Sequence, residues 1–115
     1  MTRATLEIPM RVVNESNRRD HWGVKARRVK AQRRAVALAW RAAWMPVVGI
    51  VKPSSVRLTR LAARTLDTDG LVRAFKAVRD QIAEECGFDD GDPGVRWQYA
   101  QEKAKGYAIR VEVTW

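Results

Sequence analysis

The chain has 115 residues, 46% of them hydrophobic, and a formal net charge of +9, which fits one folded domain over residues 1–115. It holds no run of about 18 apolar residues, which excludes a membrane-spanning helix, and its first residues do not have the pattern of a signal peptide. The single cysteine, Cys86, excludes an internal disulfide and a cysteine-based zinc site. We therefore expect a soluble, cytoplasmic protein.

The charge is divided unevenly along the chain. Residues 1–64 hold 15 Lys and Arg residues and three acids, a net charge of +12, whereas residues 65–115 hold seven basic and ten acidic residues, a net charge of −3. A basic half suits a polyanion such as nucleic acid, and an acidic half suits a cation. Many basic proteins bind nucleic acid without any chemistry, so the acidic half has to decide between these classes.

The first half predicts a strand, a loop and a long helix. Residues 4–13 alternate loosely and carry β-branched side chains, which favours a strand, and Pro9 indicates an edge position or a bulge. The polar residues 14–23 predict a loop. Residues 24–45 are alanine-rich and hold no Gly or Pro, so they predict a helix that ends before Pro46.

Apolar and basic side chains separate onto two faces of this predicted helix. The residues expected to face the core are Val29, Val36, Trp40 and Ala43. The residues expected on the basic face are Arg27, Lys30, Arg34 and Arg41. The basic face suits a polyanion, although a solvated stripe or a helix on a membrane surface would have the same pattern.

The second half predicts four strands and a second helix. Residues 47–51 and 54–62 predict two strands, and residues 70–85 predict a helix that ends at Gly87. The core positions of that helix are Leu71, Phe75, Val78 and Ile82.

The chain is predicted to close with a hairpin, formed by residues 95–103 and 107–115 around a turn at 104–106. The whole order, β-α-β-β-α-β-β, favours an α+β fold with a mixed sheet and two main helices.

Acidic residues flank the second predicted helix. Asp67 and Asp69 precede it, and side chains two apart in an extended segment point the same way. A tight loop after the helix holds Asp89, Asp90 and Asp92. A helix of about 16 residues spans about 24 Å, so the clusters meet only if the loop folds back or a partner subunit supplies the second cluster. Either arrangement would gather oxygen ligands suited to Mg²⁺.

A site of this kind suits phosphodiester hydrolysis, in which the metal lowers the pKa of a bound water and neutralises charge on the phosphate. Arg73 and Lys76 lie three residues apart on the second predicted helix, about one turn beyond Asp69. A cation at that place would add to the stabilisation of the phosphate.

The same residues also have ordinary structural interpretations. Asp69 suits an N-cap, Asp67 suits a solvated turn, and the later acidic loop has the composition of a surface turn. His21 is the one histidine and is typical of a polar surface or packing position, so no nucleophilic triad is compelling. The five tryptophans are more typical of core and sheet positions than of base stacking.

Taken together, these motifs resemble the RusA family of Holliday-junction resolvases, many of them encoded by phages and prophages. That family has an aspartate pair D-x-D followed by Asn-Leu, a lysine on the ensuing helix, and Asp-Asp before a C-terminal hairpin. The matching segments here are LDTDGL (66–71), KAVRD (76–80), GFDDGD (87–92) and WQYAQ (97–101). The resemblance is best over residues 60–115, and the first half matches more loosely through the polar ESNRR before the basic helix.

The resemblance implies a homodimeric, Mg²⁺-dependent endonuclease, with Mn²⁺ as a possible substitute, that resolves four-way DNA junctions by paired incisions in recombination and repair. Carried over by position, Asp67, Asp69 and Asp90 would hold the metal. Lys76 would be the essential basic residue near the phosphate.

Two departures from the family pattern bear on this assignment. Gly70 replaces the Asn that usually follows the second aspartate, and this change bears on how the metal site is supported. The spacing from Asp69 to Lys76 is about one helical turn longer than in the shortest family members. Arg73 lies nearer the acids and stays open as the alternative to Lys76.

DNA backbone contact is expected from the first predicted helix. The side chains expected to neutralise phosphates are Arg27, Arg28, Lys30, Arg33 and Arg34. Such binding is independent of sequence and is weakened by salt, and selection of branched DNA would come from the geometry of the dimer. We expect no membrane partner and no small-molecule substrate. A non-catalytic basic nucleic-acid-binding accessory protein, or an RNA-binding module, is the alternative.

Overall fold

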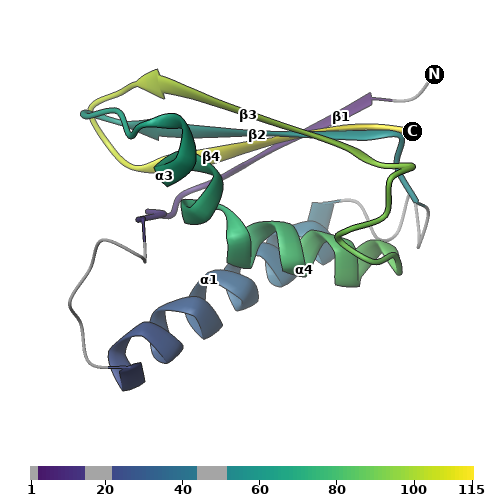
Figure 1. Cartoon of the computed structure of the whole chain (residues 1–115), viewed down its shortest axis with the longest axis horizontal. Coiled ribbons are helices and arrows are strands. Elements are labelled where there is room, and N and C mark those ends of the chain that lie inside the picture. Colours follow the sequence, from purple (N-terminus) through teal and green to yellow (C-terminus); the bar gives the residue numbers. More distant parts are fainter. Residues whose placement is uncertain (1–2, 15–21, 44–51) are drawn as a thin grey trace.

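The protein is built on a mixed four-stranded sheet with helices packed along one of its faces (Figure 1). The computed structural model describes residues 3–14, 22–43 and 52–115. Its strands are β1 (Arg3–Ile8), β2 (Ser55–Ala62), β3 (Arg96–Lys103) and β4 (Ala108–Thr114). Its helices are α1 (Trp22–Ala43), α3 (Thr68–Ala74) and α4 (Lys76–Cys86). The prediction of an α+β fold with a mixed sheet is confirmed.

The strand order is β1-β4-β2-β3, with β2 parallel to β3 and antiparallel to β4. The prediction that the last two strands form a hairpin is therefore wrong, because β2 lies between β3 and β4. The loop after β3 crosses the end of β2, where the Ala104 amide donates to the Ala62 carbonyl over 2.9 Å. The reason is burial, since β2 is the most buried strand and a central position gives it a partner on each edge.

β1 forms one edge of the sheet by pairing with β4 alone. It ends at Ile8, before Pro9, so the predicted strand over 4–13 is too long at its C-terminal side. The expectation of an edge position is confirmed, because a proline cannot donate to a ladder and is tolerated beside an open edge.

The hydrophobic core lies between the sheet and the helices. It includes Trp40 of α1, Phe75, Ile82 of α4, and Leu58 and Ile109 of the sheet, each at most 1% exposed. On α1 the predicted core residues Val36 and Trp40 are buried and Val29 is half-buried, whereas Ala43 is exposed. The prediction for Ala43 is wrong because the last described turn of α1 extends past the packed surface.

The second predicted helix is divided into α3 and α4 at Phe75, so the described residues hold three helices where two were predicted. Phe75 has φ −92° and ψ 4°, and its amide bonds to carbonyls of the last turn of α3. The four predicted core positions of this segment are nevertheless buried: Leu71, Phe75, Val78 and Ile82. The predicted stop is also confirmed, since Gly87 ends α4 with φ 72°, a conformation that favours glycine.

Some predictions lie outside the described residues. These are the strand over 47–51, the helix end at 44–45, the polar segment ESNRR at 15–19 and His21. Among the residues that are described, no helix is long and apolar enough to cross a membrane.

Candidate functional site

The first acidic pair lies at the start of α3, directly after the segment that follows β2. Asp67 is the N-cap of the helix, and its Oδ1 accepts from the Gly70 amide over 2.7 Å. Asp69 lies in the first helical turn and is exposed. The premise that both belong to one extended segment is wrong, and Asp67, not Asp69, is the cap. Both carboxylates are stabilised at the N-terminus of α3, because the helix dipole attracts negative charge there.

Side chains from the sheet hold the segment that leads to Asp67. The amide group of Gln101 on β3 donates to the Leu66 carbonyl over 2.7 Å and accepts from the Leu66 amide over 2.9 Å. The buried guanidinium of Arg60 donates to the carbonyls of Arg64 (2.6 Å) and Val12 (3.4 Å). Burial lowers the pKa of Arg60, with a smaller contribution from nearby Arg11. The backbone that precedes the acidic pair is therefore fixed to the sheet.

Gly70 fits a place that leaves no room for a side chain. A Cβ on Gly70 would lie 2.5 Å from Oδ1 of Asp67 and 3.0 Å from Nδ2 of Asn14. Asn14 is buried and comes from the segment after β1, far away in sequence. An asparagine amide therefore lies beside the acidic pair, although it is supplied by position 14 and not by position 70. This relationship could not be found from the spacing of the D-x-D motif alone.

The second acidic segment is the turn between α4 and β3. The Oδ1 atoms of Asp89 and Asp92 accept from the amides of Gly91 and Gly94, over 2.8 Å each. Asp92 also pairs with Lys52 over 2.9 Å, and the hydrogen bond from Lys52 is the main cause that lowers its pKa, followed by the Gly94 amide. The interpretation of this segment as a turn is correct for Asp89 and Asp92, whose carboxylates close it.

Arg79 of α4 ties Asp90 back to the helix. Its guanidinium donates to the Asp90 carbonyl, and its Nε lies 3.8 Å from the Asp90 carboxylate. The same group donates to the hydroxyl of Tyr99 over 2.9 Å and stacks 4.7 Å above the ring of Trp97. The loop thus folds back along α4 as far as Arg79, but within the described residues it does not bring Asp90 into one group of metal-ligating side chains with Asp67 and Asp69.

Arg79, Tyr99, Trp97 and Gln101 were not singled out as site residues from the sequence. The signal that could have found the last three is the alternation in β3, which places positions 97, 99 and 101 on the face that the helices cover. Gln101 holds the first acidic segment, and Tyr99 and Trp97 hold the second through Arg79. Because positions 99 and 101 are about 7 Å apart along a strand, one strand anchors both acidic segments at neighbouring positions.

The single chain does not complete the predicted set of metal ligands. Within residues 3–14, 22–43 and 52–115, no group of three or more His, Cys, Asp or Glu side chains is close enough to hold an ion. Asp67 and Asp69 both lie at the start of α3, and Asp90 lies beside Arg79. The donor chemistry still fits Mg²⁺, which takes one or two carboxylates together with waters and phosphate oxygens.

The two candidate basic residues line one groove between α1 and the α3–α4 segment. Arg73 and Lys76 lie on this groove with Lys25 of α1, and the cavity has a volume of about 390 Å³. Lys76 donates to both carboxylate oxygens of Asp80, each over 3.1 Å. Arg73 is four residues after Asp69 on α3, so these two side chains share a face of the helix. The groove therefore offers one cation, Arg73, on the helix face that also carries Asp69.

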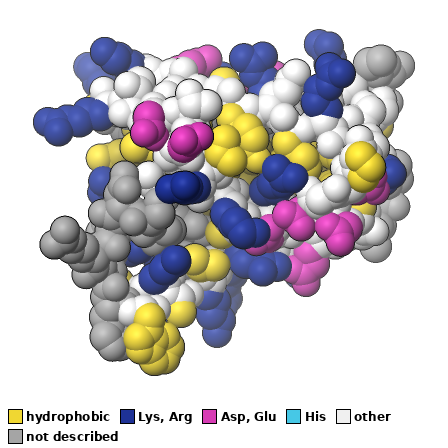
Figure 2. Space-filling model, viewed as in Figure 1, with side chains coloured by type: hydrophobic (Ala, Val, Ile, Leu, Met, Phe, Trp, Pro, Cys, Tyr) yellow, Lys and Arg dark blue, Asp and Glu magenta, His cyan; other side chains and the backbone are white. Residues whose placement is uncertain are grey.

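The predicted DNA-binding residues of α1 divide into two groups. Arg27, Lys30 and Arg34 are exposed and Arg28 is half-buried. Arg33 instead contacts α4, where its guanidinium pairs with Glu84 and donates to Gln81 over 2.9 Å. Figure 2 shows Lys and Arg side chains spread over one face of the molecule, several of them between and below two groups of acidic side chains.

No family model matches this chain, and no curated protein matches it.

Proposed function

We propose that the protein is a Mg²⁺-dependent, structure-selective DNA endonuclease of the RusA type, which acts as a homodimer and resolves four-way junctions in DNA recombination and repair. The observation that carries the proposal is the common anchoring of the two acidic segments. Gln101 and Tyr99 of β3 hold the backbone before Asp67 and the guanidinium beside Asp90, respectively. The acids that the resemblance assigns to the metal are thus tied to neighbouring positions of one strand.

The residue roles follow from this arrangement. Asp67 and Asp69 would hold the metal from the N-terminus of α3, and Asp90 would complete the set from the loop of the same chain or of the partner subunit. Mg²⁺, when bound, would activate a water and neutralise charge on the scissile phosphate. Arg73 and Lys76 would contact the phosphate from the groove between α1 and α3–α4.

The basic face of α1 would supply the affinity for DNA. Arg27, Lys30 and Arg34 are exposed and lie on one helix, so they can contact successive phosphates without reading bases. Arg33 has a structural role in holding α1 on α4, and we assign it no part in DNA contact. A twofold dimer would present two such surfaces and two acid sets to the two symmetric strands of a junction.

A synthetic four-way junction with labelled strands tests the proposal. The wild-type protein should nick it in Mg²⁺ and not in EDTA, and Asp69→Asn should bind the junction normally while cleaving at least 100-fold more slowly. Asp89→Asn is the matched control, because it removes the same charge from an exposed aspartate and an asparagine can still close the turn. Normal cleavage by Asp69→Asn would remove Asp69 from the mechanism.

A non-catalytic DNA-binding accessory protein is the second candidate. The observation in its favour is that the acids have structural tasks: Asp67 caps α3, Asp89 and Asp92 close turns, and Asp80 pairs with Lys76. This candidate predicts junction binding without any Mg²⁺-dependent nick, so the same assay separates the two.

A further inference from the structure

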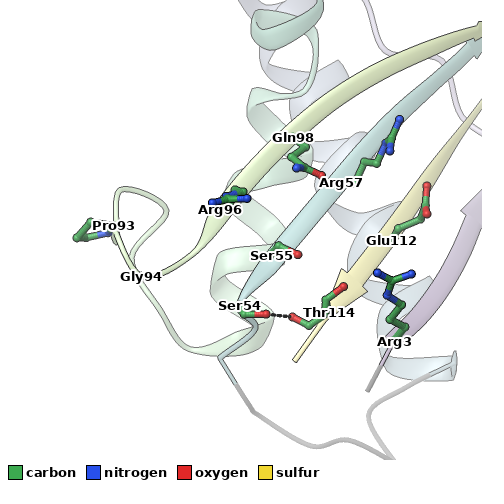
Figure 3. A pocket seen from close by; sticks show the side chains of 10 residues that line it. All are labelled: Arg3, Ser54, Ser55, Arg57, Pro93, Gly94, Arg96, Gln98, Glu112 and Thr114. Carbon is green, nitrogen blue, oxygen red and sulfur yellow. Dashed lines mark hydrogen bonds between the residues drawn. The ribbon is translucent and has the colours of Figure 1, made fainter. Parts of the chain in front are cut away.

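The face of the sheet that points away from the helices carries its own group of arginines. Arg57 on β2 lies opposite Glu112 on β4, and Arg3 on β1 lies one strand beyond, next to the end of β4. Arg96 on β3 lies opposite Ser55 of β2. Figure 3 shows these side chains around a shallow hollow, which has a volume of about 590 Å³. We call Arg3, Arg57 and Arg96 the outer arginine surface.

These three arginines differ from the fourth arginine on the same face. Arg110 is bound by both carboxylate oxygens of Glu102, over 3.1 and 3.3 Å, and this pairing raises its pKa. Arg3, Arg57 and Arg96 are exposed, and none of their guanidinium groups makes a hydrogen bond or an ion pair with any residue in the described ranges. A sheet face that satisfies one guanidinium bidentately and leaves three without a partner offers donors to an external anion.

The charges around the hollow favour a phosphate ligand. Glu112 is the one carboxylate among the described residues that line it, so three guanidiniums outweigh one acid. Neutral polar groups accompany them, including Gln98 and the hydroxyls of Ser54 and Ser55, of which Ser54 donates to the Thr114 carbonyl over 3.0 Å (Figure 3). Exposed guanidiniums with hydroxyl and amide neighbours are typical contacts of the sugar–phosphate backbone.

Because of its position, the outer arginine surface cannot contact the same straight duplex as α1. The helices cover the opposite face of the sheet (Figure 1), and the molecule measures 40 × 29 × 27 Å. A duplex lying along the basic face of α1 is therefore separated from the outer arginine surface by the whole thickness of the protein. Branched DNA can reach both faces, because its arms leave the branch point in different directions.

We propose that the outer arginine surface binds the backbone phosphates of a second arm of a branched DNA, while α1 contacts the first arm. This inference rests on the proposed function for the identity of the ligand as branched DNA, and it deepens that function by giving a reason for preferring a junction to a duplex. Arg57 and Arg96 contribute most, because they flank the hollow from adjacent central and edge strands.

The test compares two DNA ligands and two charge-matched double variants. Fluorescence anisotropy in EDTA gives the affinity for a four-way junction and for a linear duplex of one arm pair. Arg57→Gln with Arg96→Gln should weaken junction binding about tenfold, lower its salt slope by about 2, and leave duplex binding within about twofold. Unchanged duplex binding also reports that the variant is folded. Lys103→Gln with Lys105→Gln removes the same charge from the far end of β3 and the connection that follows it, and should change neither affinity.

A variant that removes a negative charge from the hollow should have the opposite effect on junction binding, which makes the test stricter. Glu112→Gln removes the one carboxylate that lines the hollow in the described part of the chain, and it should tighten junction binding about threefold while leaving duplex binding unchanged. The proposal is wrong if the arginine double variant weakens both ligands equally or weakens neither. It is also wrong if inorganic phosphate or a mononucleotide competes at micromolar concentration, because the surface would then be a site for a small anion.

The nicking assay on the wild-type protein is independent of these affinities. If the wild-type protein never nicks the junction, but the double variant of Arg57 and Arg96 loses junction binding, the nuclease proposal is refuted and the second DNA contact is retained. If the wild-type protein nicks the junction in Mg²⁺, but the double variant binds junctions normally, the nuclease proposal is retained and the second DNA contact is refuted.

Discussion

The acidic segment before α3 and the acidic segment after α4 differ in what holds them. Backbone contacts fix the first: Gln101 bonds to both polar groups of Leu66, and the Asp67 carboxylate caps the helix through the Gly70 amide. In the second segment, Arg79 joins Asp90 to Tyr99 and Trp97, and the carboxylates of Asp89 and Asp92 close the turn around Asp90. The first acidic pair is therefore held by several contacts that can fail separately, whereas the link from Asp90 to β3 depends on a single guanidinium.

Loss of Arg79 should have the largest effect on stability, because Arg79 links Asp90 to β3. Arg79→Ala removes two hydrogen bonds from a charged donor and the stacking on Trp97, so we expect the free energy of unfolding to fall by about 2 to 3 kcal/mol. Urea unfolding measures this change. In the nuclease proposal, the same variant should need at least tenfold more Mg²⁺ for half-maximal cleavage.

Arg79→Lys is the conservative comparison. It keeps the charge but cannot reach Tyr99 and Asp90 at the same time with a planar fork, so its Mg²⁺ requirement should lie between those of wild type and Arg79→Ala. If Arg79→Ala lost stability and kept the wild-type Mg²⁺ requirement, Arg79 would be a purely structural residue.

Loss of Gln101 should have a smaller effect, because other contacts still hold the first segment. Gln101→Ala leaves the Leu66 amide and carbonyl without their partner, and we expect unfolding to become easier by about 1 to 2 kcal/mol. Hydrogen exchange should show faster exchange of the Leu66 amide, with the amides of α4 unchanged. Equal acceleration in both segments would show that the contacts of Gln101 and those of Arg79 do not fail independently.

A methyl group at position 70 tests the close approach of Asp67 and Asn14. Gly70→Ala gains helix propensity but places a Cβ 2.5 Å from Oδ1 of Asp67, so the cap has to move. We expect a net loss of about 1 kcal/mol in thermal or urea unfolding, and a clear loss of cleavage in the junction assay. Asn14→Ala with Gly70→Ala should recover part of the stability if Asn14 is the neighbour that resists the methyl group.

The smallest effect concerns Asp92, in the turn between α4 and β3. The pKa of Asp92 lies below its ordinary value of 3.8 because Lys52 and the Gly94 amide bond to its charged form. The stability that this provides is present above pH 3.8 and is lost as the pH falls through the lowered pKa. Titration followed by NMR should show the lowered pKa, and Lys52→Ala should move it back toward 3.8. A pKa unaffected by Lys52→Ala would assign the shift to the Gly94 amide.

Much of the fold followed from local patterns. The spacing of Leu71, Phe75, Val78 and Ile82 predicts a buried helical face correctly, and Gly87 ends the helix as its conformational freedom suggests. Pairing of the last strands was predicted wrongly, because sequence neighbours favour a hairpin and only the burial of both faces of β2 reveals that it lies between them. The break at Phe75 interrupts a continuous apolar pattern and leaves no mark in the sequence.

The candidate site was predictable only in part. The spacing of Asp67 and Asp69 and the Asp-rich turn locate the acids along the chain, but not the residues that position them. Arg79 appears in the sequence as one cation among many, and its role depends on contacts with a strand some 20 residues later. Asn14 approaches Gly70 across more than 50 residues, a relation that local patterns do not contain.

The central claim is that the two acidic segments bind one metal ion. Measuring metal affinity in variants of each segment tests this claim most directly. Electron paramagnetic resonance of Mn²⁺, titrated into the wild-type protein with junction DNA, reports the affinity without requiring cleavage. The account predicts that Asp69→Asn and Asp90→Asn each weaken Mn²⁺ binding at least tenfold, while Asp89→Asn does not. Wild-type affinity in Asp90→Asn would contradict it, because the second acidic segment would then have no part in holding the metal.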